Sequence, residues 1–166
     1  MEQSFTLPYQ QTIIEDIQKH YKIRKIFNCT WEKESFSIRL SQFYQKKLRH
    51  SCKKEKECGN GSFLIVVIND EHPLYERNKN ITMHSLKNKY RRWTKGNYLV
   101  HGTDTKEEAE KNLKFLTGLS CDEFKKTYPD AWNGKEIEDI TPPPLSLSMM
   151  EKIELWLYRH LRNLFI

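Results

Sequence analysis

The sequence predicts an α+β fold in which helices pack on a single sheet. Four short stretches rich in β-branched or aromatic residues alternate with segments whose apolar residues recur at helical spacing. The chain has 166 residues, of which 12% are aromatic. A composition of that kind is typical of one packed domain and argues against disorder.

The four expected strands and the helices between them alternate along the chain. The strands are residues 4–7, 22–29, 63–70 and 98–101, and the helices are residues 10–21, 31–48 and 82–93. The third strand, FLIVVIND, is continuously apolar over six residues, which is typical of a strand covered on both faces. The fourth, YLVH, ends at His101, directly before Gly102.

Capping signals mark the helices that follow. Thr105 and Glu108 form a T-x-x-E capping box, and Gly118 closes the helix that it opens. A second box at SCDEF opens a short helix before Pro129. We therefore divide the chain into an α+β domain (residues 1–118), a short helix with a proline-rich connector (119–144) and a C-terminal amphipathic helix (145–166).

Composition restricts the class of partner and the compartment. The chain carries 28 Lys and Arg against 22 Asp and Glu, an excess that favours anionic partners but is also ordinary for a soluble protein. The cysteines, at positions 29, 52, 58 and 121, have no C-x-x-C spacing, so we expect free thiols and no metal site.

The first residues do not resemble a signal peptide, and no apolar run approaches the ~20 residues that span a bilayer. The expected location is the cytoplasm.

His101 is the candidate functional residue. A strand end that precedes a helix lies at the sheet edge, where helix amides form a natural phosphate site. Gly102 permits close approach of the backbone, and an imidazole can act at neutral pH as a nucleophile or proton carrier. Together these features suit phosphoryl chemistry. The alternative is structural: the ring covers the strand end and Gly102 makes the turn.

The segment NYLVHGTDTKEEAEKNLKFL, residues 97–116, resembles the region around the active-site histidine of nucleoside diphosphate kinases. The order of elements over residues 3–117 is similar to that family as well. The resemblance implies a ferredoxin-like fold with a four-stranded antiparallel sheet, whose fourth strand delivers His101.

The same resemblance implies a nucleotide or phosphate site with His101 as its catalytic residue. The implied ligand contacts are Tyr44, Arg91, Arg92, Thr94, Asn97 and Gly102. Since Arg91 and Arg92 are adjacent on a helix, they diverge by ~100°, so only one faces the site easily. Mg²⁺ could accompany the phosphates of a nucleotide, although the sequence assigns no ligands to it.

The sequence departs from the family at three places. Leu7 stands before Pro8 where the family has a phosphate-binding lysine. Only residues 94–96 precede Asn97, where the family has a long loop carrying another arginine. Asn97 lies four residues before His101 instead of three. Whether the protein is a phosphotransferase or a nucleotide-sensing module without turnover therefore stays open.

A third class is a nucleic-acid or partner-binding module. Its basis is the basic segment KKLRHSCKKEK, residues 46–56, although solvated lysine loops are common and no RNA-binding signature accompanies it. The apolar stripe of the C-terminal helix predicts packing on the sheet or on a second subunit, which would give a homo-oligomer.

Overall fold

β1 (Lys22–Thr30) is the central strand of a mixed three-stranded sheet. It pairs antiparallel with β2 (Ser62–Asn69) and parallel with β5 (Glu138–Ile140), so the strand order is β2-β1-β5. The computed structural model describes residues 7–48, 53–58, 61–96 and 98–161. A separate two-stranded hairpin joins β3 (Tyr75–Glu76) to β4 (Lys79–Asn80).

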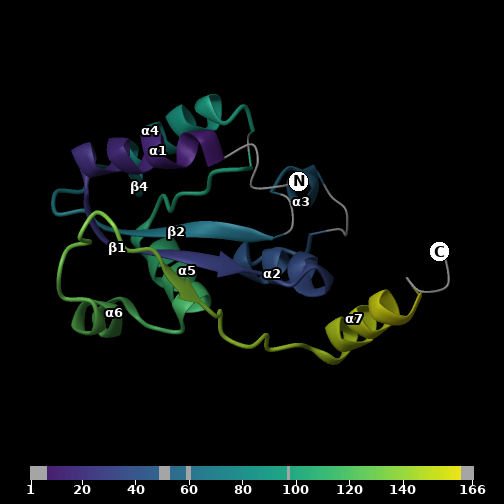
Figure 1. Cartoon of the computed structure of the whole chain (residues 1–166). Helices are drawn as coiled ribbons and strands as arrows, with labels where there is room; N and C mark the ends of the chain where they lie inside the picture. The colour runs from purple at the N-terminus through teal and green to yellow at the C-terminus, as the bar shows by residue number, and fades with distance from the viewer. Residues whose placement is uncertain (1–6, 49–52, 59–60, 97, 162–166) are drawn as a thin grey trace.

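Helices cover both faces of the sheet, so the α+β class is confirmed (Figure 1). In the described residues they are α1 (Leu7–His20), the 3-10 turn η2 (Lys33–Ser35), α2 (Phe36–Phe43), α3 (Lys53–Cys58), α4 (Ile81–Trp93), α5 (Lys106–Thr117), α6 (Cys121–Thr127) and α7 (Met149–Leu161). Figure 1 shows α1 and α4 above the sheet and α2, α5 and α6 below it.

An irregularity in β1 lets one strand serve two cores. The register between β1 and β2 shifts between Ile23 and Lys25, as it does at a β-bulge. In a regular strand, Ile23 and Ile26 would point to opposite faces, because their positions differ by an odd number. With the register shift they belong to the same cluster, and they pack with Ile14 of α1. Phe27 belongs to the cluster of the opposite face. The expectation that β2 is covered on both faces is confirmed, because its side chains alternate between the two clusters.

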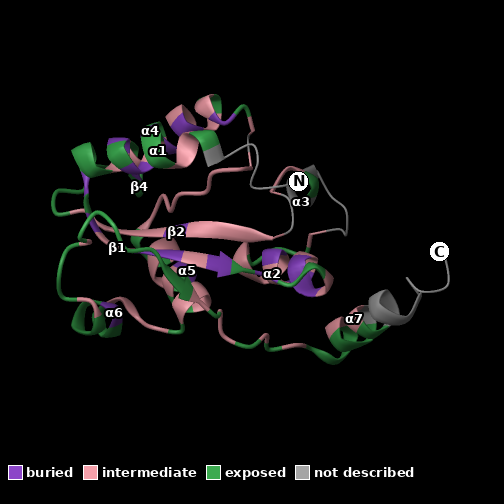
Figure 2. Cartoon of the chain, in the orientation of Figure 1, coloured by how far each residue is buried: buried purple, intermediate pink, exposed green. Residues whose placement is uncertain are grey.

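The lower core is aromatic. Phe27 and Cys29 are fully buried, and Trp31 follows them at the end of β1 (Figure 2). The Phe27 ring meets Phe124 at 6.2 Å and Tyr128 at 5.6 Å between centroids, both edge to face. Since Phe124 lies in α6, this core already includes the segment that follows Gly118.

A buried polar contact joins α1 to α4 on the upper face. Asp16 is 7% exposed and accepts hydrogen bonds from Lys89 Nζ at 2.8 Å and from the Tyr90 hydroxyl at 3.0 Å. The hydrogen bond from Lys89, which outweighs the effect of burial, holds the pKa of Asp16 below its usual value. The carboxylate therefore stays charged at neutral pH and fixes the two helices to each other.

The expected four-stranded antiparallel sheet is wrong for the described residues. Residues 98–101 form an irregular segment, in which the carbonyl groups of Tyr98 and Val100 accept from the side chains of Cys58 and Arg91 and not from a neighbouring strand. The free side of β1 is occupied instead by β5, from the stretch expected to be an irregular connector. Of the expected first strand, residues 4–6 lie outside the described residues, and Leu7 begins α1.

The helix caps that the sequence predicts are largely present in the structure. Thr105 accepts a hydrogen bond from the Glu108 amide at 3.1 Å and caps α5, and Gly118 ends α5 in the left-handed conformation with φ 80°. Ser120 and Glu123 form the complete capping box of α6. The box predicted at Ser120 is confirmed, whereas at Thr105 only the threonine half is present, because Glu108 Oε2 accepts from the Asp104 amide instead of the Thr105 amide. The helix expected over residues 31–48 is shorter, being η2 and α2.

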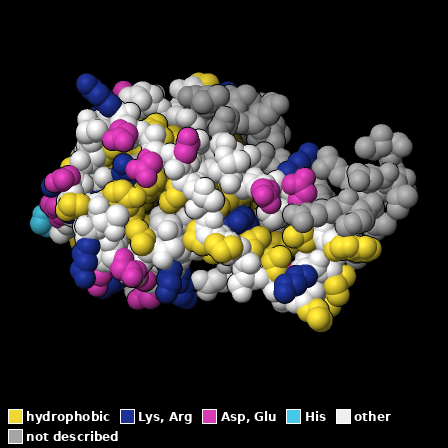
Figure 3. Space-filling model, turned by 60° about the horizontal axis from the view of Figure 1, so that its bottom comes forward, with side chains coloured by type: hydrophobic (Ala, Val, Ile, Leu, Met, Phe, Trp, Pro, Cys, Tyr) yellow, Lys and Arg dark blue, Asp and Glu magenta, His cyan; other side chains and the backbone are white. Residues whose placement is uncertain are grey.

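α7 lies at the end of an extended arm, away from the sheet (Figure 1). Hydrophobic side chains gather at this end of the surface in Figure 3. Among the side chains of α7 that the structure describes, the large exposed apolar ones are Met149, Met150, Ile153 and Trp156. None of the helices in the described part of the chain has the length and apolar character to cross a lipid bilayer.

Candidate functional site

The segment of residues 98–104 is held in place by side chains of α4. Arg91 Nε donates a hydrogen bond to the carbonyl oxygen of Val100 at 3.0 Å. One turn earlier in the helix, Lys87 Nζ donates to the carbonyl oxygen of Gly102 at 3.1 Å. Because these carbonyls have side-chain donors, the segment needs no strand partner to satisfy them.

Lys87 also pairs with Asp104, and this pair is largely buried. The Lys87 Nζ to Asp104 Oδ1 distance is 2.6 Å, and the two side chains are 8% and 21% exposed. Burial acts to raise the pKa of Asp104, but the hydrogen bond and charge of Lys87, with help from His84, outweigh it and lower the pKa. The Asp104 backbone is fixed too: its carbonyl accepts from the Asn80 amide at 2.7 Å, and its amide donates to Glu108 Oε2 at 2.7 Å.

Both ring nitrogens of His101 have neighbours within hydrogen-bonding distance. Nδ1 lies 3.4 Å from the Tyr44 hydroxyl, and Nε2 lies 3.1 Å from Asn112 Nδ2 and 3.5 Å from Glu108 Oε1. With the Asn112 amide as donor, Nε2 accepts and the ring proton sits on Nδ1. A proton on Nε2 would instead face the Glu108 carboxylate. The side chain is 24% exposed, so the ring is reachable from solvent and not sealed in the interior.

Aromatic rings of α2 and its cap enclose the imidazole. Phe43 and Tyr44 meet the His101 ring edge to face, at 5.0 and 5.3 Å between centroids. Burial, with nearby Cys58 adding to it, raises the pKa of Tyr44 well above its ordinary value, while the positive charge of Arg91 acts in the opposite sense. The Tyr44 hydroxyl therefore stays protonated at neutral pH and remains a hydrogen-bond donor.

The structure brings three of the expected site residues together. Tyr44 contacts His101 directly, and Arg91 binds the carbonyl of the residue before His101 and lies close enough to act on the Tyr44 hydroxyl. Gly102 follows in the same segment, where a Cβ would come within 3.1 Å of Met83 Sδ. Glycine thus allows close packing on α4, whereas a Cβ would require the Met83 side chain to shift slightly.

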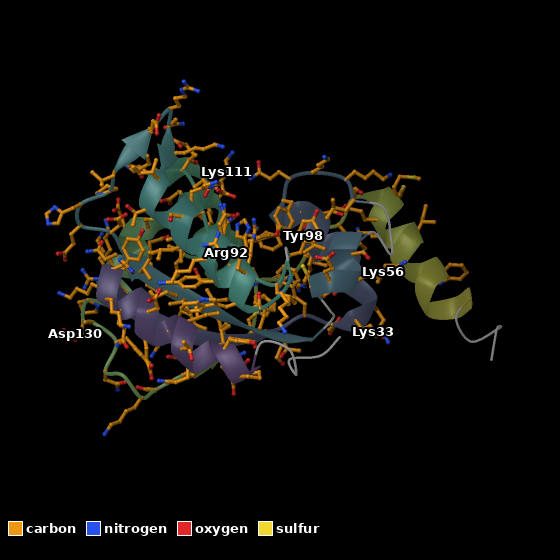
Figure 4. The ribbon with its side chains drawn as sticks, turned by 90° about the horizontal axis from the view of Figure 1, so that it is seen from above. Lys33, Lys56, Arg92, Tyr98, Lys111 and Asp130 are labelled. Atoms are coloured by element: carbon orange, nitrogen blue, oxygen red, sulfur yellow. The ribbon has the colours of Figure 1, made fainter. Side chains whose placement is uncertain are left out.

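Arg92 and Thr94 are placed elsewhere. Arg92 is exposed on α4, as Figure 4 shows, and diverges from Arg91 as expected for adjacent helical residues. Thr94 is 4% exposed, and its hydroxyl donates to the Tyr90 carbonyl at 3.1 Å, where it caps the end of α4. Asn97 lies outside the described residues.

Tyr98 connects the same segment to α3. In Figure 4 Tyr98 lies between α4, which carries Arg92, and the helices toward α7. Its carbonyl accepts a hydrogen bond from Cys58 Sγ at 3.2 Å. Of the basic segment 46–56, residues 49–52 are outside the described part of the chain, and α3 begins at Lys53.

Sequence reasoning missed four residues of the site. Glu108 and Asn112 are spaced i, i+4 on α5, so they share the helix face that meets His101. This spacing could have been recognised in the sequence. No sequence pattern indicated Lys87 or Asp104, because a lysine within a charged helix is typical of a solvated surface. In the described residues, no three His, Cys, Asp or Glu side chains converge as they would to hold a metal ion.

Comparisons of the chain with family models, with curated proteins and with solved structures find no match.

Replacing Lys87 with methionine tests how the segment is held. We expect Lys87→Met to lower the free energy of unfolding by about 3 kcal/mol at pH 7, because Asp104 keeps a partly buried charge without its partner. Since the pKa of Asp104 is lowered in the folded protein, this difference should shrink as the pH falls below about 4. Urea unfolding measures both values.

The matched control is Lys79→Met, because Lys79 is exposed in β4. This control should cost less than about 0.5 kcal/mol. Equal losses in the two variants would show that the ammonium of Lys87 does not hold the segment.

Proposed function

We propose that this protein binds a phosphate-containing anion, of the nucleotide class, at the surface formed by Arg91, Tyr44 and His101. The observation that carries the proposal is the state of Arg91. Its Nε is occupied by the Val100 carbonyl, and among the described residues its two terminal nitrogens have no hydrogen-bond partner. The guanidinium is therefore fixed in position while its terminal donors stay available.

A fixed guanidinium suits this class of ligand. Its terminal nitrogens can bind two phosphate oxygens at once, and a head already held in place loses less entropy on binding. The Tyr44 hydroxyl and the His101 ring lie beside it as further polar groups. The resemblance of residues 97–116 to nucleoside diphosphate kinases supports the same ligand class.

Binding without turnover is the version that the geometry favours. The two nitrogens of His101 face Tyr44 and Asn112, so attack by either nitrogen requires one contact to be exchanged. The family's phosphate-binding lysine and its long arginine-bearing loop also have no counterpart in this sequence. A sensing role needs neither of them.

A phosphotransferase is the second candidate, and one observation favours it. Glu108 Oε1 lies 3.5 Å from Nε2 of His101, where a carboxylate would orient the ring and leave Nδ1 to attack. Nδ1 would then take the terminal phosphoryl group of a nucleoside triphosphate and release the diphosphate, with Tyr44 giving up its contact.

We also propose that α7 contacts a second copy of the chain. The exposure of Met149, Met150, Ile153 and Trp156 supports this proposal, since single large apolar residues are common on surfaces but a contiguous group is not. Sedimentation of the full chain over a range of concentrations tests it.

Arg91→Ala should weaken nucleotide binding by roughly 10- to 100-fold, the cost of about 1.5–3 kcal/mol for one charge-assisted contact. Titration calorimetry with ATP, GTP and tripolyphosphate measures the affinity. Arg92→Ala is the matched control, since it removes the same charge from the neighbouring exposed position and should change the affinity less than about threefold.

Equal weakening by both arginine variants would contradict the proposed anchor. So would tight binding of a single-stranded oligonucleotide that weakens steeply with salt and does not depend on Arg91, because that result indicates a nucleic-acid module.

Turnover is tested separately. The full chain and His101→Gln are incubated with nucleoside triphosphate labelled at the γ-phosphate, and acid-labile label on the protein is measured. For a binding protein we expect no label on either. Label on the wild type that His101→Gln abolishes would select the phosphotransferase, and equal label on both would exclude His101 as the acceptor.

A further inference from the structure

A polar pocket, separate from the surface around His101, is lined by residues where α1 ends and β1 begins, and Figure 1 shows this junction at the opposite end of the sheet from α7. Its volume is about 460 Å³, within the range of small-molecule sites. It is lined by Gln18, Lys19, His20, Tyr21, Lys22, Asn69, Asp70, Glu71, His72 and Thr82. Every lining residue has a side chain that carries a polar group.

Charges of opposite sign come from different elements of this pocket. The end of α1 and the start of β1 contribute the cationic Lys19 and Lys22, whereas the loop after β2 contributes Asp70 and Glu71. Within the described residues, no ion pair joins the two sides. The two lysines and the two carboxylates therefore balance in formal charge but lie on different sides of the pocket, unpaired with each other.

The acidic side is held in place by local hydrogen bonds. Asp70 Oδ1 accepts from the His72 amide at 3.2 Å, and Oδ2 accepts from Asn80 Nδ2 at 2.7 Å. Glu71 Oε1 accepts from Asn69 Nδ2 at 3.3 Å. The carboxylates are thus fixed on the loop and do not fold over to neutralise the lysines.

Tyr21 adds an unpaired donor. It is the one buried residue of the lining, at 8% exposure, and its hydroxyl is buried with no hydrogen-bond partner. Burial, together with the negative charge of Asp70, raises the pKa of Tyr21 to about 12, so the hydroxyl keeps its proton. Because Asp70 acts on it, this hydroxyl lies on the acidic side of the pocket, and its burial keeps it out of direct contact with a ligand there.

We propose that this pocket binds a small zwitterion, a free α-amino acid. Its carboxylate would lie toward Lys19 and Lys22, and its ammonium group toward Asp70 and Glu71. A ligand with a single charge would be attracted by one side and repelled by the other, whereas a dipolar ligand matches both. This site is independent of the one around His101.

The test titrates the isotope-labelled full chain with each of the common L-amino acids at millimolar concentration, followed by amide NMR. Ethanolamine and acetate are the probes that carry one charge each. We expect at least one amino acid to shift the amides of residues 18–22 and 69–72 saturably, and neither single-charge probe to do so. No shift with any amino acid, or an equal response to acetate, would overturn the proposal.

Variants then locate the ligand. Lys22→Met should weaken binding of the amino acid several-fold, since it removes one of the two positive charges on the side proposed for the ligand carboxylate. Lys19→Met and Glu71→Gln should each weaken it several-fold. Their matched controls are Lys33→Met, at the far end of the molecule in Figure 4, and Glu76→Gln in the exposed hairpin. Wild-type affinity in all three pocket variants would show that the amino acid binds elsewhere.

Discussion

The buried ammonium of Lys87 is the contact on which the candidate site depends. It reaches the Gly102 carbonyl and the Asp104 carboxylate at once, and so bridges α4 to the segment that enters α5. A lysine that is only 7% exposed is stable there because its ammonium group donates to both a carbonyl oxygen and a carboxylate. His101 lies between the two points that α4 holds, Val100 and Gly102, and its position follows from theirs.

The same segment carries the chain from one face of the sheet to the other. Val100 packs with the cluster of α1 and α4, whereas the His101 ring meets Phe43 and Tyr44, which pack on the lower core. The site therefore lies where this segment passes between the two faces, and it draws its side chains from α2 and its C-cap, from α4 and from α5. A surface assembled from three separate elements is a common place for ligand recognition, because a rigid scaffold positions each group.

Contacts local in sequence were predictable, and those set by tertiary structure were not. The caps at Thr105 and Ser120 involve residues three apart, and β1 and β2 have strong strand composition. β5 has no strand signature, since a three-residue segment with two acids forms a strand only because β1 offers it a free edge. Residues 98–101, in contrast, have strand-like composition but form no strand. The carbonyl groups of Tyr98 and Val100 accept hydrogen bonds from side chains in place of a neighbouring strand. Of the site, the sequence pointed to Tyr44, Arg91 and His101 but not to the buried pair that holds them.

A double-mutant cycle between Lys87 and Asp104 tests this dependence most directly. The free energy of unfolding is measured for the wild type, Lys87→Met, Asp104→Asn and the double variant. We expect a coupling free energy of at least about 1 kcal/mol, with the double variant more stable than the sum of the single losses allows. Additive losses would show that the two side chains act independently, and that α4 does not position the His101 segment through this pair.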